Sequence, residues 1–189
     1  MRFARTFEPN MKRLTHILIL LFALLAPTWA RAECAVVYGK FWAFAFSTPA
    51  KWSSLCNADK QIGVPVAFWQ EGASFSNSPA VMYVAASAKD KRTLPQFVSD
   101  SQDAFRKQAA GVKFVALDEK CGDGKLQAVQ YSASGDPGGN AERICYVEGP
   151  ASYFVVVLSA RNTKVLETAA PAFRELLASF VPMSARIEK

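Results

Sequence analysis

Three clusters of turn-forming residues divide residues 113–160 into four short segments, and this division constrains the fold more than any other feature of the chain. The clusters are Cys121–Gly124, Gly135–Asn140 and Gly149–Pro150. Glycine, proline, aspartate and asparagine favour the backbone conformations of tight turns. Strands joined by such turns pair antiparallel. The sequence therefore predicts four successive antiparallel strands, at 113–118, 126–133, 144–148 and 153–160.

Further strand-like segments precede this stretch. Residues 41–46 are apolar on both faces of a strand, and the following residues 49–52 predict a turn. Residues 64–69 and 81–85 predict two antiparallel strands joined by a polar loop. Residues 153–158 are apolar throughout, so we expect this strand in the middle of the sheet, beneath a helix.

Two segments have the periodicity of amphipathic helices. Thr93 and Gln96 have the spacing of a capping box, and apolar residues recur on one face as far as Gly111. The second helix is predicted to begin near Thr168, which places Pro171 in its first turn, where proline costs no hydrogen bond. This order of elements predicts an α+β domain with a mostly antiparallel sheet of about six to seven strands, flanked by two main helices.

Residues 1–32 have the features of a secretion signal. A positive region, a short apolar region and an A-x-A cleavage site follow one another, at Lys12–Arg13, Ile17–Ala26 and Ala30–Ala32. Either Met1 or Met11 could be the start. The apolar run is shorter than a membrane span. We expect a cleaved signal, a single domain at 33–181 and a flexible tail at 182–189, which has no periodicity.

Processing would change the chemistry that the chain can offer. The sole histidine, His16, lies in the predicted signal, so the mature chain would lack an imidazole base or metal ligand. The formal net charge of +6 would fall to +2, because the removed segment holds five basic residues and one acidic residue. The remaining charges are dispersed, which argues against nucleic-acid binding. A periplasmic or secreted protein without a membrane span is expected.

Four cysteines follow the predicted signal. An even number in an oxidising compartment predicts two disulfides. We favour the pairs Cys34–Cys56 and Cys121–Cys145, because each closes a local segment, although three connectivities are open. A metal site is the weaker alternative, because the spacings contain no C-x-x-C and the mature chain would contain no histidine.

The acidic residues provide few candidates for catalysis. Asp100 and Asp103 have i,i+3 spacing on a helix, and Asp118 and Glu119 are adjacent. We expect the first pair on the solvated face of its helix. Residues 136–140 carry oxygen ligands, but they lack the alternating acids of a calcium loop and predict a hairpin turn. No catalytic residue, cofactor or metal site is predicted.

Aromatic residues are frequent in the mature chain, and most are expected in the core. One or two could instead stand exposed and contact a ligand. The best candidate is Trp69, beside the loop that runs from Glu71 to Ser78 and contains Phe75. The sequence therefore suggests a binding edge formed by Trp69, Glu71 and Phe75.

The layout resembles that of the Mog1/PsbP-like family. Residues 46–52 resemble its opening F-x-x-P-x-x-W segment, residues 94–97 resemble the start of its central helix, and residues 173–180 resemble its final segment. These are packing positions, so the resemblance is one of fold. The family includes a GTPase-binding transport factor, photosystem II subunits and bacterial envelope proteins, so the resemblance implies binding or assembly.

The expected function is that of a non-enzymatic binding or accessory module that contacts another envelope protein. Two alternatives stay open. One is a hydrolase or isomerase that uses carboxylates alone, which would require two close carboxyls with displaced pKa values in a cleft. The other is a structural or toxin-neutralising envelope protein. A shallow apolar patch rimmed by polar groups would favour the binding module.

Overall fold

The computed structural model describes residues 36–185. The chain divides into two units, 1–32 and 33–189, and every described residue belongs to the second. The predicted signal, its cleavage site and Cys34 lie outside the described residues, as do residues 186–189. The predictions made for these residues stay untested. No helix in the described range is long and apolar enough to cross a membrane.

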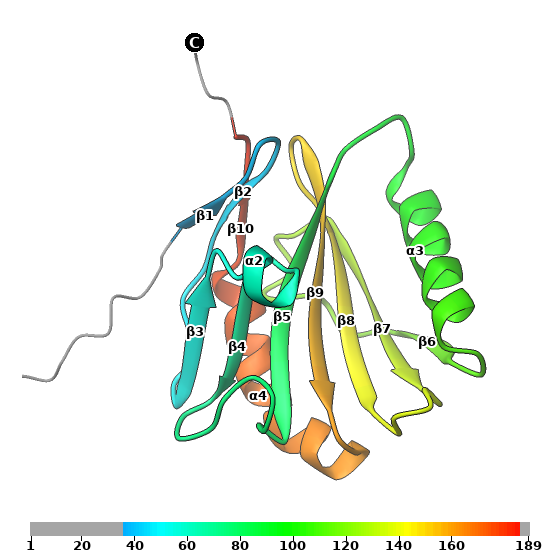
Figure 1. The fold of residues 1–189 in the computed structure, drawn as a ribbon. Helices are drawn as coiled ribbons and strands as arrows, with labels where there is room; N and C mark the ends of the chain where they lie inside the picture. Colours follow the sequence, from blue (N-terminus) through cyan, green and yellow to red (C-terminus); the bar gives the residue numbers. More distant parts are fainter. Residues whose placement is uncertain (1–35, 186–189) are drawn as a thin grey trace, which may run out of the picture. The chain divides into compact units, whose positions relative to one another are not determined.

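The main sheet of the described domain has seven strands, all antiparallel, in the order β3-β4-β5-β9-β8-β7-β6 (Figure 1). β9 lies at its centre, as the apolar run of residues 153–158 predicts. The strands are β3 (Trp52–Cys56), β4 (Val66–Gln70), β5 (Ala80–Ala88), β6 (Lys113–Leu117), β7 (Ala128–Ser134), β8 (Ala141–Glu148) and β9 (Ser152–Ala160).

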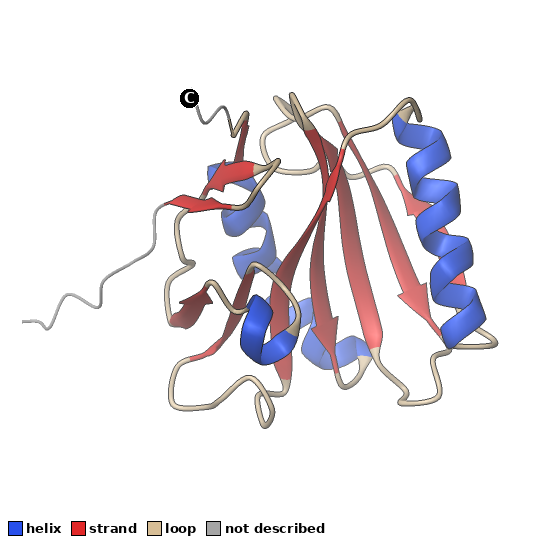
Figure 2. Cartoon of the chain, turned by 45° about the horizontal axis from the view of Figure 1, so that its top comes forward, coloured by secondary structure: helices blue, strands red, loops and turns tan. Residues whose placement is uncertain are grey.

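Two long helices cover opposite faces of this sheet (Figures 1 and 2). α3 (Leu94–Gln108) packs on the side of Tyr153 and Val157, and α4 (Thr163–Ser179) packs on the other side. A short helix, α2 (Asp59–Ile62), connects β3 to β4. The α+β class and the antiparallel sheet with flanking helices are therefore confirmed.

The start of α3 follows its sequence signal closely. The Thr93 side chain accepts a hydrogen bond from the Gln96 backbone, and the Thr93 backbone N–H donates to the Gln96 side chain. This reciprocal capping satisfies two amide groups that a helix terminus leaves without partners. The helix ends at Gln108, shortly before Gly111.

The start of α4 differs from the prediction. The helix begins at Thr163 rather than near Thr168, because Asn162 caps it by accepting a hydrogen bond from the Val165 backbone N–H at 3.0 Å. Pro171 consequently lies inside the helix. Its ring is on the exposed side, so the carbonyl that loses its donor faces solvent, where water can bond to it.

A second, small sheet joins the two ends of the described chain. Its strands are β1 (Val36–Tyr38), β2 (Ala43–Ala45) and β10 (Val181–Met183), in the order β1-β2-β10. The predicted tail at 182–189 is therefore wrong for Pro182 and Met183, which pair with β2. The strand predicted at 41–46 is shorter, and within residues 36–185 its pairing partners are β1 and β10.

The small sheet and α4 share one hydrophobic core. Phe44 stacks on Phe180 with ring centroids 5.1 Å apart, and it meets Phe154 edge-on at 5.5 Å. Phe46 meets Phe68 of the main sheet edge-on at 5.1 Å. These contacts hold the small sheet against the face of the main sheet that α4 also covers.

Candidate binding surface and cleft

The outer face of the small sheet is apolar and exposed. Val36 and Val181 both lie opposite Ala45, and Tyr38 and Met183 both lie opposite Ala43. Val36 and Val181 are each 52% exposed and Tyr38 is 73% exposed. We define the outer face of the small sheet as Val36, Tyr38, Ala43, Ala45, Val181 and Met183, of which Ala43 is buried and Ala45 and Met183 are half-buried.

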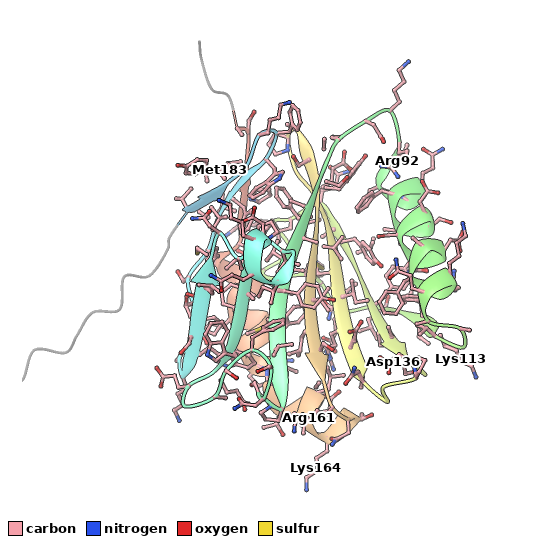
Figure 3. All side chains as sticks on the ribbon, in the orientation of Figure 1. Arg92, Lys113, Asp136, Arg161, Lys164 and Met183 are labelled. Atoms are coloured by element: carbon pink, nitrogen blue, oxygen red, sulfur yellow. A yellow bond between two sulfur atoms is a disulfide. The ribbon has the colours of Figure 1, made fainter. Side chains whose placement is uncertain are left out.

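The strand period explains why these side chains point outward. Successive residues of a strand alternate between its two faces. Val37 and Phe44 point inward and are almost fully buried, which leaves their neighbours on the other side. Figure 3 labels Met183 at this end of the domain, remote from Arg161 and Lys164. A sheet with one face in water normally carries polar residues there, so this face is unusual.

The turn between β1 and β2 lies beside the outer face. Its Phe41 is 52% exposed, and the Lys40 ammonium lies 4.8 Å from the centroid of that ring. The Ser152 hydroxyl donates a hydrogen bond of 2.9 Å to the Phe41 carbonyl. This bond holds the turn against the start of β9.

A cleft of about 670 Å³ adjoins the small sheet at β10. Its walls come from β10, the end of α4, the loop before β7 and the turn between β8 and β9. Apolar side chains line most of it, among them Leu126, Pro150, Ala178, Phe180, Val181 and Pro182. Val181 therefore belongs both to the cleft and to the outer face of the small sheet.

Two ion pairs lie at the cleft. The Lys89 ammonium donates a hydrogen bond to the Glu148 carboxylate, and Lys125 Nζ lies 2.5 Å from Asp123 Oδ2. The hydrogen bond to Glu148 raises the pKa of Lys89. The hydrogen bond between Lys125 and Asp123 raises the pKa of the lysine and lowers the pKa of the aspartate. Lys89, Lys125 and Asp123 are therefore charged at neutral pH.

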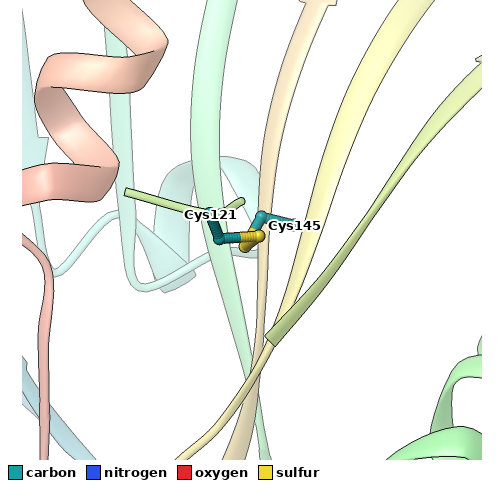
Figure 4. Close-up of a disulfide and its surroundings, with 2 residues drawn as sticks. All are labelled: Cys121 and Cys145. Carbon is teal, nitrogen blue, oxygen red and sulfur yellow. A yellow bond between two sulfur atoms is a disulfide. The ribbon is translucent and has the colours of Figure 1, made fainter. Parts of the chain in front are cut away.

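The predicted Cys121–Cys145 disulfide anchors one wall of this cleft (Figure 4). It ties the loop that carries Asp123 and Lys125 to β8, with 6.1 Å between the two Cα atoms. Gly122 has a φ of +65°, and an added Cβ would lie 2.6 Å from the Leu177 carbonyl oxygen. Only glycine fits there without a shift, so the loop lies directly on α4.

The other cysteine pair is half outside the described residues. Cys56 is disulfide-bonded, and its predicted partner Cys34 lies outside residues 36–185. The connectivity Cys34–Cys56 stays a prediction.

The structure does not bring the predicted binding edge together at one cleft. Trp69 is half-buried on β4, and its alternation with Phe68 and Gln70 directs it to the opposite face from them. Glu71 is exposed and lines a separate depression of about 820 Å³, which neither Trp69 nor Phe75 lines. Phe75 is half-buried in the following loop. This edge stays a prediction.

The acidic candidates hold basic or polar partners, and Asp100, Asp103 and Glu119 are exposed whereas Asp136 is half-buried. Asp100 pairs with Arg92 at 3.1 Å, and Asp103 pairs with Arg106 at 2.8 Å. Glu119 pairs with Arg143 at 2.6 Å. Asp136 accepts two hydrogen bonds from Asn140 across the predicted hairpin turn. Among the described residues, no cluster of three or more His, Cys, Asp or Glu could hold a metal ion.

One carboxyl that the sequence did not single out lies between α3 and the sheet. Burial raises the pKa of Glu142, and the charge of Asp136 adds to this effect. Burial also raises the pKa of Tyr83, and it raises the pKa of Tyr146 to about 12. Gln102 on α3 is buried nearby. Glu142 shares its face of β8 with the buried Ile144 and Tyr146, a relationship visible only once the bounds of the strand are known.

The chain matches no protein-family model and no curated protein. It is similar to the solution structure of cyanobacterial PsbP (CyanoP) from Synechocystis sp. PCC 6803, with 18% identity and a TM-score of 0.48 over 74% of this chain and 86% of that chain. It is also similar to the crystal structure of LpqN, described as involved in cell envelope biogenesis of Mycobacterium tuberculosis. That likeness has 14% identity and a TM-score of 0.50 over 74% of this chain and 83% of that chain.

At such identities the likeness concerns the fold alone. This chain has an antiparallel seven-stranded sheet, a three-stranded sheet and flanking helices, which is consistent with a PsbP-like fold. The expectation drawn from residues 46–52, 94–97 and 173–180 is therefore confirmed at the level of the fold. The described domain has a Mog1/PsbP-like fold.

Proposed function

We propose that this protein is an extracytoplasmic binding module without catalytic activity, and that it docks another envelope protein through the outer face of its small sheet. The observation that carries the proposal is the exposure of Val36, Tyr38 and Val181 on one face. Exposed apolar patches mark interaction sites on soluble domains.

Tyr38 is the expected anchor of this contact. Tyrosine combines a large apolar ring with a hydroxyl that can find a hydrogen bond, and it is enriched at the centres of interfaces. Complete burial of a valine-sized side chain contributes about 1.5–3 kcal/mol. Val36 and Val181 are already about half covered, so each offers roughly half of that amount.

Three observations support a location outside the cytoplasm. The Cys121–Cys145 disulfide is buried in the core, and such bridges persist in oxidising compartments. Residues 1–32 have the order of a secretion signal. The similar structure LpqN is described as involved in cell envelope biogenesis.

The carboxyl groups favour binding over catalysis. Asp100 and Asp103 are exposed and paired with arginines, which suits a solvated helix face. Glu142 has a raised pKa, but its acidic neighbour Asp136 is held by Asn140 in a turn. A carboxylate mechanism needs a second carboxyl free to act on the substrate. This arrangement therefore supports the binding module over the carboxylate enzyme.

Site-specific photocrosslinking tests the proposal. A crosslinking amino acid placed at Tyr38 should capture one defined envelope protein, and Val181→Ser should weaken that capture. The matched control position is Val115 on the edge strand β6, which is 59% exposed but lies outside the small sheet. Equal capture from Val115, or capture at Tyr38 that Val181→Ser leaves unchanged, would contradict docking through this face.

A further inference from the structure

The cleft beside β10 is a second site with its own chemistry. Its volume of about 670 Å³ lies within the range of small-ligand sites, roughly 300–1,000 Å³. It shares Val181 with the outer face, but Val36 and Tyr38 do not line it. A ligand could therefore occupy it whether or not a protein covers Tyr38.

The charges around the cleft balance each other. Lys89 with Glu148 stands on the side of the main sheet, and Lys125 with Asp123 stands on the disulfide-anchored loop. A ligand with a single charge would bond to one member of an ion pair and draw it away from its partner. The charge of that partner would then be uncompensated. A zwitterion offers a carboxylate to a lysine and an ammonium to an acid, so it keeps the balance.

The apolar residues of the cleft favour a ligand that also has an apolar side chain. Leu126 and Pro182 line the cleft and are partly exposed, so they can contact an apolar side chain. Addition of an extended strand to β10 is disfavoured, because Pro182 has no N–H to donate along that edge. Recognition must then come from the ends and side chains of the ligand rather than from a backbone ladder.

The wall is fixed before any ligand arrives. The disulfide ties its loop to β8, and the close approach of Gly122 to Leu177 seats it on α4. Gly149, at the opposite side, has no room for a side chain, since an added Cβ would lie 2.7 Å from the Phe154 ring. A preformed site costs less ordering when it binds.

We propose that this cleft binds a short peptide that has an apolar side chain and two free termini. Its carboxylate bonds to Lys89, its ammonium bonds to Glu148 or Asp123, and its side chain contacts Leu126 and Pro182. This site does not depend on the proposed contact of the small sheet with an envelope protein.

Titration of the purified protein with the dipeptide Leu-Leu tests this inference. Calorimetry should detect binding, and blocking either terminus, as N-acetyl-Leu-Leu or Leu-Leu-amide, should weaken it about tenfold or more, the loss of one charged contact. Backbone amide NMR shifts should change at Leu126, Gly149 and Phe180. Equal binding of the blocked peptides, shifts located elsewhere, or no binding would overturn the proposal.

Variants separate the charged contacts from the shape of the cleft. Lys89→Gln should weaken Leu-Leu binding about tenfold, whereas Arg106→Gln, which breaks an exposed ion pair on α3, should leave it unchanged. Ala178→Trp places a large side chain in the cleft from an exposed position of α4 and should abolish binding. Retained binding in Ala178→Trp would place the peptide elsewhere. Crosslinking from Tyr38 should be unaffected by Lys89→Gln, so each proposal can fail without the other.

Discussion

Val36 and Val181 lie at opposite ends of the described chain, and both pair with Ala45 of β2. Each end contributes one outer strand to the small sheet, and β2 joins them. The apolar outer face therefore depends on tertiary contacts between the chain ends rather than on any local segment.

The Cys121–Cys145 bridge should contribute strongly to stability. In the double variant Cys121→Ala, Cys145→Ala we expect the free energy of unfolding to fall by about 3 kcal/mol, because the bridge restricts the unfolded chain over a sequence separation of 24. Urea denaturation followed by circular dichroism measures this. A loss below about 1 kcal/mol would show that the loop needs no covalent anchor.

Substitution of the acidic residues of α3 should change the free energy of unfolding much less than truncation of the core aromatic residues. Asp100→Ala and Asp103→Ala should each change the free energy of unfolding by no more than about 0.5 kcal/mol, as at exposed positions. Phe173→Ala should cost about 3–5 kcal/mol, because its side chain is buried. Phe105 is only half-buried, so its truncation should cost less than that of Phe173. A large effect of either aspartate would reopen the active-site interpretation.

The Asn162 cap and the internal Pro171 of α4 can be tested separately. Asn162→Ala removes the cap that accepts from Val165 and should cost about 1 kcal/mol. Pro171→Ala restores a helical N–H at an exposed position and should stabilise the protein by about 2 kcal/mol, after the greater freedom of the unfolded chain is counted. Thermal unfolding of both variants provides the comparison. Destabilisation by Pro171→Ala would mean that the proline ring makes a needed contact.

Glu142 should make stability depend on pH. Burial raises its pKa from the ordinary value of 4.5, so the folded state holds the proton more tightly than the unfolded chain does. Its contribution is complete below pH 4.5 and is lost as the pH rises through the raised value. Glu142→Gln should therefore be more stable than the parent near neutral pH and should lose this part of the pH dependence. Parallel unfolding curves of the two proteins at every pH would contradict the burial of this carboxyl.

The processing and the second disulfide can be tested on the exported protein. Intact mass should show cleavage after Ala32 without a lipid on Cys34, and peptide mapping without reduction should give a Cys34–Cys56 link. The order of the signal regions predicts the cleavage, and the even cysteine count predicts the second disulfide. Retention of the apolar segment would refute the signal, whereas a different partner for Cys56 would refute only the connectivity.

Features with a local cause could be predicted from the sequence. The capping box of Thr93 and Gln96 fixes the start of α3 within a few residues, and the turn clusters at 135–140 and 149–150 separate β7, β8 and β9. The apolar run at 153–158 was sufficient to place β9 at the sheet centre. The predicted start of α4 near Thr168 is wrong because Asn162 caps the helix earlier and the exposed Pro171 is tolerated inside it.

Features that depend on distant pairing could not be predicted. β1 and β10 are too short to show a period. β3 is not predicted, because the turn predicted at 49–52 includes its first residue and residues 53–56 show no clear alternation. The outer face needs the register of β1 and β10 on Ala45, which no local pattern contains. Cysteine spacing suggested Cys121–Cys145, but not that this bridge would form the wall of a cleft.

The outer face is complete only after β10, the last strand of the described chain, pairs with β2. β1 and β2 are synthesised first, and β10 follows all other strands, so a growing or truncated chain presents Val36 and Tyr38 without their neighbour Val181. A partner that needs all three side chains can recognise only a folded copy in which β10 is paired with β2. The same geometry that joins the chain ends would thus keep unfinished molecules out of any assembly that this face builds.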